Sequence, residues 1–209
     1  MSTLLVMGAG GHGRVVADAA TTMGCWSTIG FADDRAPAVV VPGFEVVGTS
    51  ADLDRLRDAY AAAVIGIGDA RTRLQLMERC VESGFELPVI VHRSAAVSVQ
   101  ASIGAGSVVF AQSAVNPGAT LCRGCIVNTG ATVDHDCQLD EGVHVCPGAH
   151  LAGNVRVGAR TWIGVGACVK QGVRIGSDVV IGAGAAVVSD VESGLTVVGV
   201  PARVTERKA

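Results

Sequence analysis

The sequence predicts two segments of different fold class, a small α/β domain over residues 1–92 and a parallel β-helix over residues 93–209. Strand-like and helix-like patterns alternate in the first segment. From residue 97 onward an aliphatic residue recurs at every sixth position. The chain also holds 28 Gly but only 3% aromatic residues, which favours a core of small and branched aliphatic side chains.

The elements of the first segment follow from hydrophobic periodicity. Apolar residues at helical spacing predict a helix over 13–23, and Ser50 with Asp52 can cap a second helix from about 51 to 60. We also expect a helix over about 70–83, and strands over 3–7, 28–32, 62–67 and 86–91. Strands that alternate with helices in this way are typical of a parallel sheet.

The second segment is organised by a repeat of six residues. A β-sandwich would alternate with a period of two and vary its loop lengths, so it does not explain the pattern. Three hexads make one triangular coil of eighteen residues, and sixteen hexads therefore predict about five coils. The aliphatic positions are Val97, Ile103, Val109, Val115, Leu121, Val127, Val133, Leu139, Val145, Leu151, Val157, Ile163, Val169, Ile175, Ile181 and Val187.

A glycine motif, G-x-G-x-x-G, follows the first predicted strand and opens the first predicted helix. Glycines let the backbone approach a phosphate, and a helix N-terminus favours its negative charge. Asp33 and Asp34 end the second predicted strand, as in a dinucleotide fingerprint. The domain is only half a doubly wound fold, so we interpret it as a Rossmann-like half domain whose loop holds the diphosphate of a nucleotide-linked ligand. NAD binding and a simple tight turn are the alternatives. The candidate loop residues are Gly8, Gly10, Gly11, His12 and Gly13.

A second loop is expected beside the first. Gly68 and Asp69 follow the third predicted strand. Because ligands bind at the carboxyl ends of parallel strands, these two residues are further candidates for substrate binding.

His135 is the most chemically suggestive residue of the repeat segment, since acids flank it at Asp134 and Asp136. A neutral imidazole can take a proton near pH 7, and a carboxylate can fix its tautomer. A solvated turn histidine is the alternative. Gly153 lies eighteen residues later, so it should stack about 4.8 Å above His135, with its N–H free to face a reaction centre.

The other histidines and the cysteines favour no metal site. His144 and His150 are six residues apart, which puts them on different sides of the triangle from each other. Cys122 and Cys125 have a zinc-like spacing but no second pair. Cys125 and Cys137 occupy the small inward position of the repeat, where packing is the expected role.

Charge and composition exclude several classes of protein. The 16 Lys and Arg against 19 Asp and Glu give a net charge of -3, which argues against nucleic-acid binding. No apolar run approaches ~18 residues, so we expect no membrane span. The start has no basic leader and the cysteine count is odd, at seven, which predicts reduced thiols and a cytoplasmic location.

Taken together, the two segments resemble the bacterial nucleotide-linked amino-sugar N-acetyltransferases, such as the bacillosamine and perosamine enzymes; sialic-acid O-acetyltransferases are related. That family often has His-Glu where this chain has His135-Asp136. The resemblance covers essentially the whole chain. It is carried by Gly8–Gly13, Asp33, Asp34, Gly68, Asp69, Asn128, Thr129, His135, Asp136, His144, Ala152, Gly153, Asn154 and Gly199–Ala202.

The resemblance implies a left-handed β-helix, a homotrimer with sites between subunits, and acetyl-CoA as co-substrate. It implies acetylation of an amino group on a UDP-, GDP- or dTDP-linked amino-deoxy sugar, for surface polysaccharide or glycan synthesis. His135 would be the general base, assisted by Asp136, and the Gly153 amide would stabilise the oxyanion. His144 and Asn128 would position the acetyl group and the sugar, and the backbone near Val165 and Ala183 would line the acetyl-CoA groove.

Other functions remain open at this point. A sugar O-acetyltransferase would use the same base on a hydroxyl group. A nucleotide-binding scaffold would need no base at all. An NAD oxidoreductase would need a second catalytic domain, and the sequence offers none.

Overall fold

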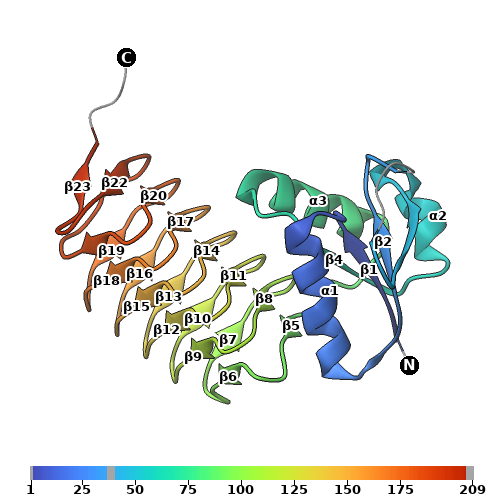
Figure 1. Ribbon diagram of the computed structural model, residues 1–209, viewed down its shortest axis with the longest axis horizontal. Helices are drawn as coiled ribbons and strands as arrows, with labels where there is room; N and C mark the ends of the chain where they lie inside the picture. Colours follow the sequence, from blue (N-terminus) through green and yellow to red (C-terminus); the bar gives the residue numbers. More distant parts are fainter. Residues whose placement is uncertain (1, 37–40, 206–209) are drawn as a thin grey trace. The chain divides into compact units, whose positions relative to one another are not determined.

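The computed structural model describes residues 2–36 and 41–205. The chain divides into two compact units, Met1–Arg93 and Ser94–Ala209, called here the N-terminal and C-terminal units. Figure 1 labels their elements. Within the described ranges, no helix is both long enough and apolar enough to cross a membrane.

The N-terminal unit is built on a parallel sheet of strand order β3-β2-β1-β4. This arrangement confirms the α/β class expected for the segment. Its strands are β1 (Ser2–Met7), β2 (Trp26–Ala32), β3 (Glu45–Gly48) and β4 (Ala62–Ile65); its helices are α1 (Gly11–Met23), the 3-10 turn η1 (Ser50–Asp52), α2 (Leu53–Arg57) and α3 (Ala70–Glu82).

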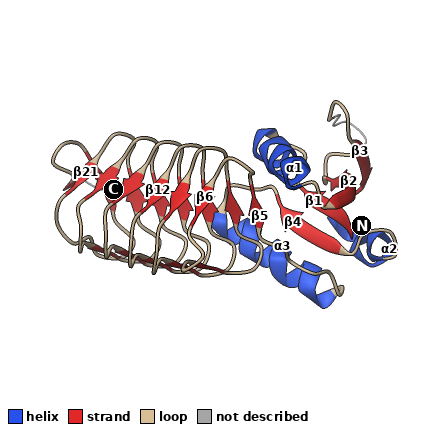
Figure 2. Cartoon of the chain, turned by 90° about the horizontal axis from the view of Figure 1, so that it is seen from below, coloured by secondary structure: helices blue, strands red, loops and turns tan. Residues whose placement is uncertain are grey.

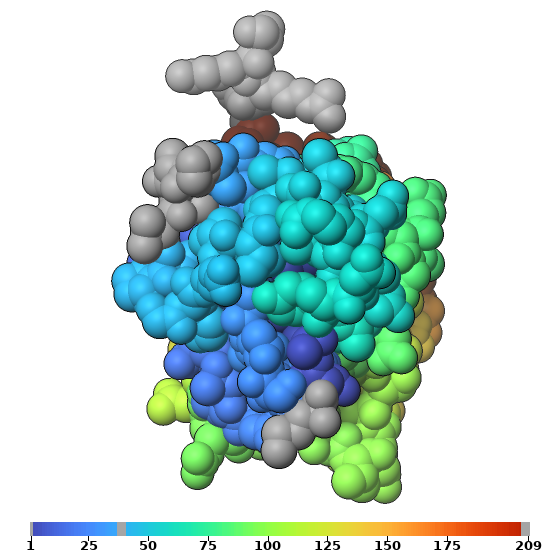
Figure 3. Space-filling model, turned by 90° about the vertical axis from the view of Figure 1, so that its right-hand side faces the viewer, coloured from blue at the N-terminus to red at the C-terminus, as the bar shows by residue number. Residues whose placement is uncertain are grey.

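Helices cover both faces of this sheet. Successive strand residues point to opposite faces, and Leu5 and Met7 pack in one cluster with Leu56 and Met77 from α2 and α3. Figure 2 shows α1 on the other face, toward which the intervening strand residues point. Figure 3 shows α2 in cyan at the surface of the unit. The sheet is therefore buried from both sides along Leu4–Met7 and Ala62–Ile65, which explains why these segments are apolar.

The segment after β3 differs from the predicted helix over 51–60. The first turn is a 3-10 helix, and α2 has only five residues. The cap is Thr49 and not Ser50, because the Thr49 hydroxyl accepts from the Ala51 N–H and Asp52 accepts from the Thr49 N–H, closing a capping box.

The predicted strand over 86–91 is wrong for most of its length. Glu86 forms only an isolated bridge to Ala62, and the strand β5 is limited to Ile90–Val91. Pro88 has no N–H to give to a ladder, which accounts for the interruption. The edge strand β3 was not predicted.

The C-terminal unit is a parallel β-helix whose two-residue strands, up to Val187, pair with strands eighteen residues away, as the repeat predicts. The pattern ends there, because Thr196–Val198 pairs with a strand sixteen residues earlier and runs antiparallel to Arg203–Val204. Figure 1 shows the stacked coils. One column holds β6 (Ala96–Val97), β9 (Ala114–Val115), β12 (Thr132–Val133), β15 (His150–Leu151), β18 (Cys168–Val169) and β21 (Ala186–Val187). The second holds β7 (Ser102–Ile103), β10 (Thr120–Leu121), β13 (Gln138–Leu139), β16 (Arg156–Val157) and β19 (Arg174–Ile175). The third includes β8 (Val108–Val109), β11 (Ile126–Val127), β14 (His144–Val145), β17 (Trp162–Ile163), β20 (Val180–Ile181), β22 (Thr196–Val198) and β23 (Arg203–Val204).

The core of the prism is formed by the sixfold aliphatic positions. Every one from Val109 to Val187 is buried, while Val97 and Ile103 in the first coil are half-buried. Cys125 and Cys137 are fully buried in the small inward positions, so their packing role is confirmed. Each coil turns three corners, and two of them carry the candidate site residues: the His135 corner, made by the turns after β9, β12, β15 and β18, and the Asn128 corner, made by the turns after β11, β14, β17 and β20.

Candidate functional site

The glycine motif is built by close approach of backbone to backbone. Gly8 has φ 103°, in the region that favours glycine, and a Cβ on Gly13 would overlap the Gly8 carbonyl oxygen. A Cβ on Gly66 would lie 2.6 Å from the Gly13 Cα. Helix α1 can therefore begin directly against the ends of β1 and β4 only because these three residues lack side chains.

A cavity of about 430 Å³ opens over this loop. Its lining comes from the carboxyl ends of β1, β2 and β4, where ligands bind in parallel sheets. Two of the predicted substrate-binding residues do not line the cavity. Gly13 is buried beneath the loop, and Asp69 caps α3 by accepting from the Thr72 N–H at 2.8 Å. Of the predicted substrate-binding residues, those that line the cavity are Gly8, Gly10, Gly11, His12, Asp33, Asp34 and Gly68.

Both acids at the end of β2 accept hydrogen bonds from other residues of the N-terminal unit. Asp33 accepts from the Ala9 N–H at 2.8 Å and from the Arg35 guanidinium, and hydrogen bonding by Arg35 is the main reason that its pKa lies well below the ordinary value. Asp34 accepts from the Ser50 N–H at 2.7 Å and from the Ser50 hydroxyl. Arg35 was not predicted as a site residue, although it directly follows the acid pair, and Ser50 was expected only as a helix cap.

His12 is neutral in this site. Burial is the main cause that lowers its pKa from 6.5 to about 4, and the positive charge of Arg73 adds to the effect. Arg73 is buried and donates to the carbonyl oxygens of Ile67 and Gly68 at 3.0 and 2.7 Å, so it shapes the second loop. Arg73 was not predicted as a site residue, because nothing in the pattern of α3 marks it as buried.

In the C-terminal unit, side-chain hydrogen bonds order the turn that carries His135. Asp134 accepts from the His135 N–H at 2.8 Å and from the Asn116 side chain of the preceding coil, also at 2.8 Å. Asp136 adopts φ 58°, a left-handed conformation that aspartate tolerates. This turn places the Asp136 carboxylate 2.9 Å from Nδ1 of His135.

The carboxylate sets the chemistry of the imidazole. Hydrogen bonding to Asp136 is the main cause that raises the pKa of His135 above 6.5, and the charges of Asp134 and Asp136 act in the same direction. Because an ionised carboxylate only accepts, the Nδ1 atom of the neutral ring carries the proton. Nε2 is then left with its lone pair, so it is the atom that can act as a base.

Gly153 provides the space for this ring. Gly172 donates its N–H to the Gly153 carbonyl at 3.0 Å, and Asn154 donates to the His135 carbonyl at 2.8 Å, which holds the coils in register. A Cβ on Gly153 would overlap Nε2 of His135 and lie 2.5 Å from Cε1. The Gly153 N–H donates to no backbone carbonyl among the described residues.

A hollow of about 400 Å³ is lined by His135 and Gly153. It is lined by residues of three successive turns of the His135 corner, including Asn154, Gln171 and Gly172. The side chain of His135 is 61% exposed, so a ligand in this hollow can reach the ring.

Asn128 and His144 form a separate group. The Asn128 amide lies 3.1 Å from Nε2 of His144, and Trp162 packs edge-to-face on the buried His144 ring at 4.3 Å. Asn128 also accepts from the Thr129 N–H at 2.8 Å. This group stands on the β11–β14–β17 column and does not line the hollow beside His135, so one chain does not bring all the predicted catalytic residues together.

Val165 and Ala183 stack on the Asn128 corner, one coil apart. The Gly184 N–H donates to the Val165 carbonyl at 2.8 Å, and the Val165 side chain is exposed. Within residues 2–36 and 41–205, no group of three or more His, Cys, Asp or Glu side chains is arranged to hold a metal ion.

Two family models match the chain. Residues 3–80 match the PglD N-terminal domain, and residues 154–189 match the hexapeptide repeat of succinyl-transferase. The matches fall one in each unit, and they confirm the predicted fold class, a Rossmann-like α/β segment followed by a left-handed β-helix.

Solved structures are similar over the full length. The acetyltransferase domain of PglB from Neisseria gonorrhoeae FA1090, in complex with acetyl coenzyme A, is 48% identical, with 98% of this chain and 99% of that chain covered and a TM-score of 0.94. PerB from Caulobacter crescentus, in complex with CoA and GDP-perosamine, is 39% identical, with 98% of each chain covered and a TM-score of 0.90. WeeI from Acinetobacter baumannii AYE is 25% identical, with 98% and 100% covered and a TM-score of 0.91.

Proposed function

This chain belongs to the family of sugar N-acetyltransferases that includes the PglB acetyltransferase domain and PerB, and we propose that it transfers the acetyl group of acetyl-CoA to the amino group of a nucleotide-linked amino-deoxy sugar. One observation carries the assignment of the site. Nε2 of His135, with Nδ1 held by Asp136, stands against a glycine whose N–H is not used by the backbone, beside an open hollow.

The chemistry follows from these atoms. The sugar amine attacks the thioester carbonyl carbon while Nε2 of His135 takes a proton from the amine as general base. The Gly153 N–H stabilises the negative oxygen of the tetrahedral intermediate. The intermediate then expels the thiolate of CoA, which takes the proton back from the imidazolium, and the products are an amide and free CoA.

Asp136 has a supporting role in this reaction. Its carboxylate orients the ring and stabilises the imidazolium that forms when the amine loses its proton. We infer direct attack, because Cys137, the cysteine that directly follows Asp136, is an unsuitable nucleophile: it is buried, and burial is the main cause that raises its pKa.

The N-terminal unit is proposed to bind the nucleotide part of the sugar substrate. The cavity over Gly10 and Gly11 opens at the start of α1, where backbone N–H groups suit a phosphate. His12, Asp33, Asp34 and Gly68 complete the lining, while Gly13 and Asp69 act by shaping the two loops.

Acetyl-CoA is proposed to lie between neighbouring subunits of a homotrimer, with its pantetheine along the backbone near Val165 and Ala183. Two observations support an assembly. Asn128 and His144 stand on a different face from His135, and on that face Trp162 is 39% exposed. Light scattering tests the assembly, with three times the mass of one chain expected in solution.

We place the enzyme in the cytoplasm, where acetyl-CoA is made and thiols stay reduced. All seven cysteines lie among the described residues, and none forms a disulfide.

The deciding experiment measures release of the CoA thiol from acetyl-CoA with a panel of UDP-, GDP- and dTDP-linked amino sugars. We expect release with at least one amino sugar and none with its hydroxyl counterpart; the opposite result would indicate O-acetylation. His135→Ala should lower kcat by about 10²–10⁴-fold. Full activity of that variant would show that another group accepts the proton.

A further inference from the structure

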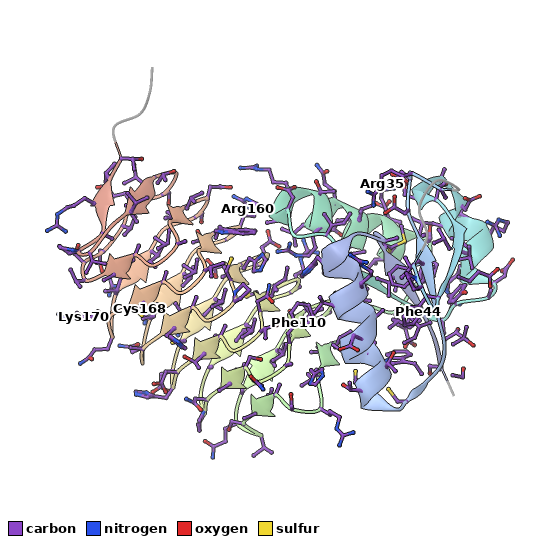
Figure 4. The ribbon with its side chains drawn as sticks, viewed as in Figure 1. Arg35, Phe44, Phe110, Arg160, Cys168 and Lys170 are labelled. Carbon is purple, nitrogen blue, oxygen red and sulfur yellow. The ribbon has the colours of Figure 1, made fainter. Side chains whose placement is uncertain are left out.

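Arg35 is the strongest feature that the proposed reaction does not yet use. It lies at the end of β2, where Figure 4 labels it, and it lines the cavity of the N-terminal unit. Its side chain is 65% exposed, yet its position is fixed by an ion pair with the nearly buried Asp33.

The ion pair has a two-point geometry. Nε of Arg35 donates to one carboxylate oxygen of Asp33 and Nη2 donates to the other, both at 2.8 Å. The Arg35 backbone N–H adds a third bond at 2.9 Å. Such paired bonds hold a guanidinium in one orientation, which a single contact would not do.

This orientation brings the guanidinium to the glycine loop. Nη2 of Arg35 lies 4.0 Å from the point where a Cβ of Gly10 would stand, and Asp33 itself accepts from the Ala9 N–H at 2.8 Å. One carboxylate therefore joins the loop to the arginine. A guanidinium has five N–H donors, and Asp33 takes two, so donors on Nη1 and Nη2 are left for a ligand.

Charge explains why the site needs this arginine. A lone carboxylate at Ala9 would repel an anion at the start of α1. Arg35 neutralises that carboxylate and adds donors at the same place. We propose that Arg35, clamped by Asp33, binds the diphosphate of the nucleotide-linked substrate against the Gly10 loop. Asp33 then acts as a positioning residue and makes no ligand contact of its own.

The test is direct binding of UDP, GDP and dTDP by calorimetry, which needs no acetyl transfer. Arg35→Ala should weaken the binding of whichever diphosphate the native enzyme binds by about 10- to 100-fold. Binding of the matching nucleoside, which has no phosphate, should stay unchanged. Arg35→Lys keeps the positive charge but lacks the planar guanidinium, so its affinity for the diphosphate should fall less than that of the alanine variant. Arg55→Ala is the matched control, because Arg55 is 62% exposed, pairs with Asp52 and does not line the cavity.

Asp33→Asn distinguishes the positioning of Arg35 by Asp33 from the effect of net charge on anion binding. Removing a negative charge from an anion site should tighten binding if charge alone matters, whereas we expect weaker binding because Arg35 loses its anchor. A salt titration adds a second readout, since loss of the arginine contact should reduce the dependence of Kd on ionic strength.

The inference rests on the proposed function only for the identity of the ligand, and the outcomes are distinguishable. If the native enzyme binds none of the three diphosphates, both the nucleotide assignment and the Arg35 proposal fail. If it binds one and Arg35→Ala binds it equally well, only the Arg35 proposal fails. Equal loss for nucleoside and diphosphate would place Arg35 on the base and would also overturn it.

Discussion

Replacing Gly153 with alanine should displace the catalytic ring without unfolding the coil. Gly153 is not among the residues with positive φ, so alanine suits its backbone. Its new Cβ would lie 2.5 Å from Cε1 and 3.0 Å from Cδ2 of His135, whereas carbon atoms in ordinary contact are about 3.5–4.0 Å apart. The imidazole must therefore move by about 1 Å, and a misplacement of that size costs about 100-fold in rate.

The assay is kcat for acetyl transfer at saturating concentrations of both substrates, with the melting temperature as a check on folding. Gly158→Ala is the matched control, because its Cβ would lie 2.5 Å from the backbone nitrogen of Ser177, at a corner with no candidate site residue. We expect the control to lose stability and keep its kcat. If Gly153→Ala keeps kcat within about twofold of the native value, the ring is not the base or does not occupy this position.

Two further predictions concern the acid beside the base and the cap of η1. Asp136→Asn removes the main cause of the raised His135 pKa, so the acidic limb of the kcat/KM profile against pH should move to lower pH; an unmoved limb would mean that a different group titrates. Thr49→Ala removes the capping hydroxyl and should destabilise the N-terminal unit by about 1 kcal/mol in urea unfolding. Asp18→Asn, at an exposed position of α1, serves as its comparison, and equal loss in both variants would contradict the capping box.

The C-terminal unit could be predicted almost residue by residue, because its strands repeat with one fixed geometric period. Once eighteen residues make a coil, the neighbours of His135 follow from counting, and Gly153 is found where the count puts it. The conformation of the turn also has a local cause, since the neighbouring acids Asp134 and Asp136 both form hydrogen bonds with His135.

The N-terminal unit was harder to predict because its elements depend on tertiary contacts. β3 is a short edge strand whose pairing with β2 gives no periodic signal. The 86–91 segment is apolar enough for a strand, but Pro88 interrupts it, so only the isolated bridge at Glu86 and the two-residue strand β5 are formed. The roles of Arg35 and Arg73 depend on where long side chains end, and neither spacing nor composition reports that.

The short acid at position 136 is compatible with its proposed role because of the backbone that carries it. An aspartate has one methylene fewer than the glutamate common in the family, which by itself would leave its carboxylate farther from Nδ1. The left-handed conformation at φ 58° turns the side chain back toward the preceding residue, and the resulting distance is 2.9 Å. Asp136 also lies over Gly118 of the preceding coil, where a Cβ would be 2.5 Å from Oδ1. The backbone at 136 thus directs the carboxylate and Gly118 leaves room for it, so a side chain at position 118 should displace Asp136 and act on the base through it, although it contacts no substrate.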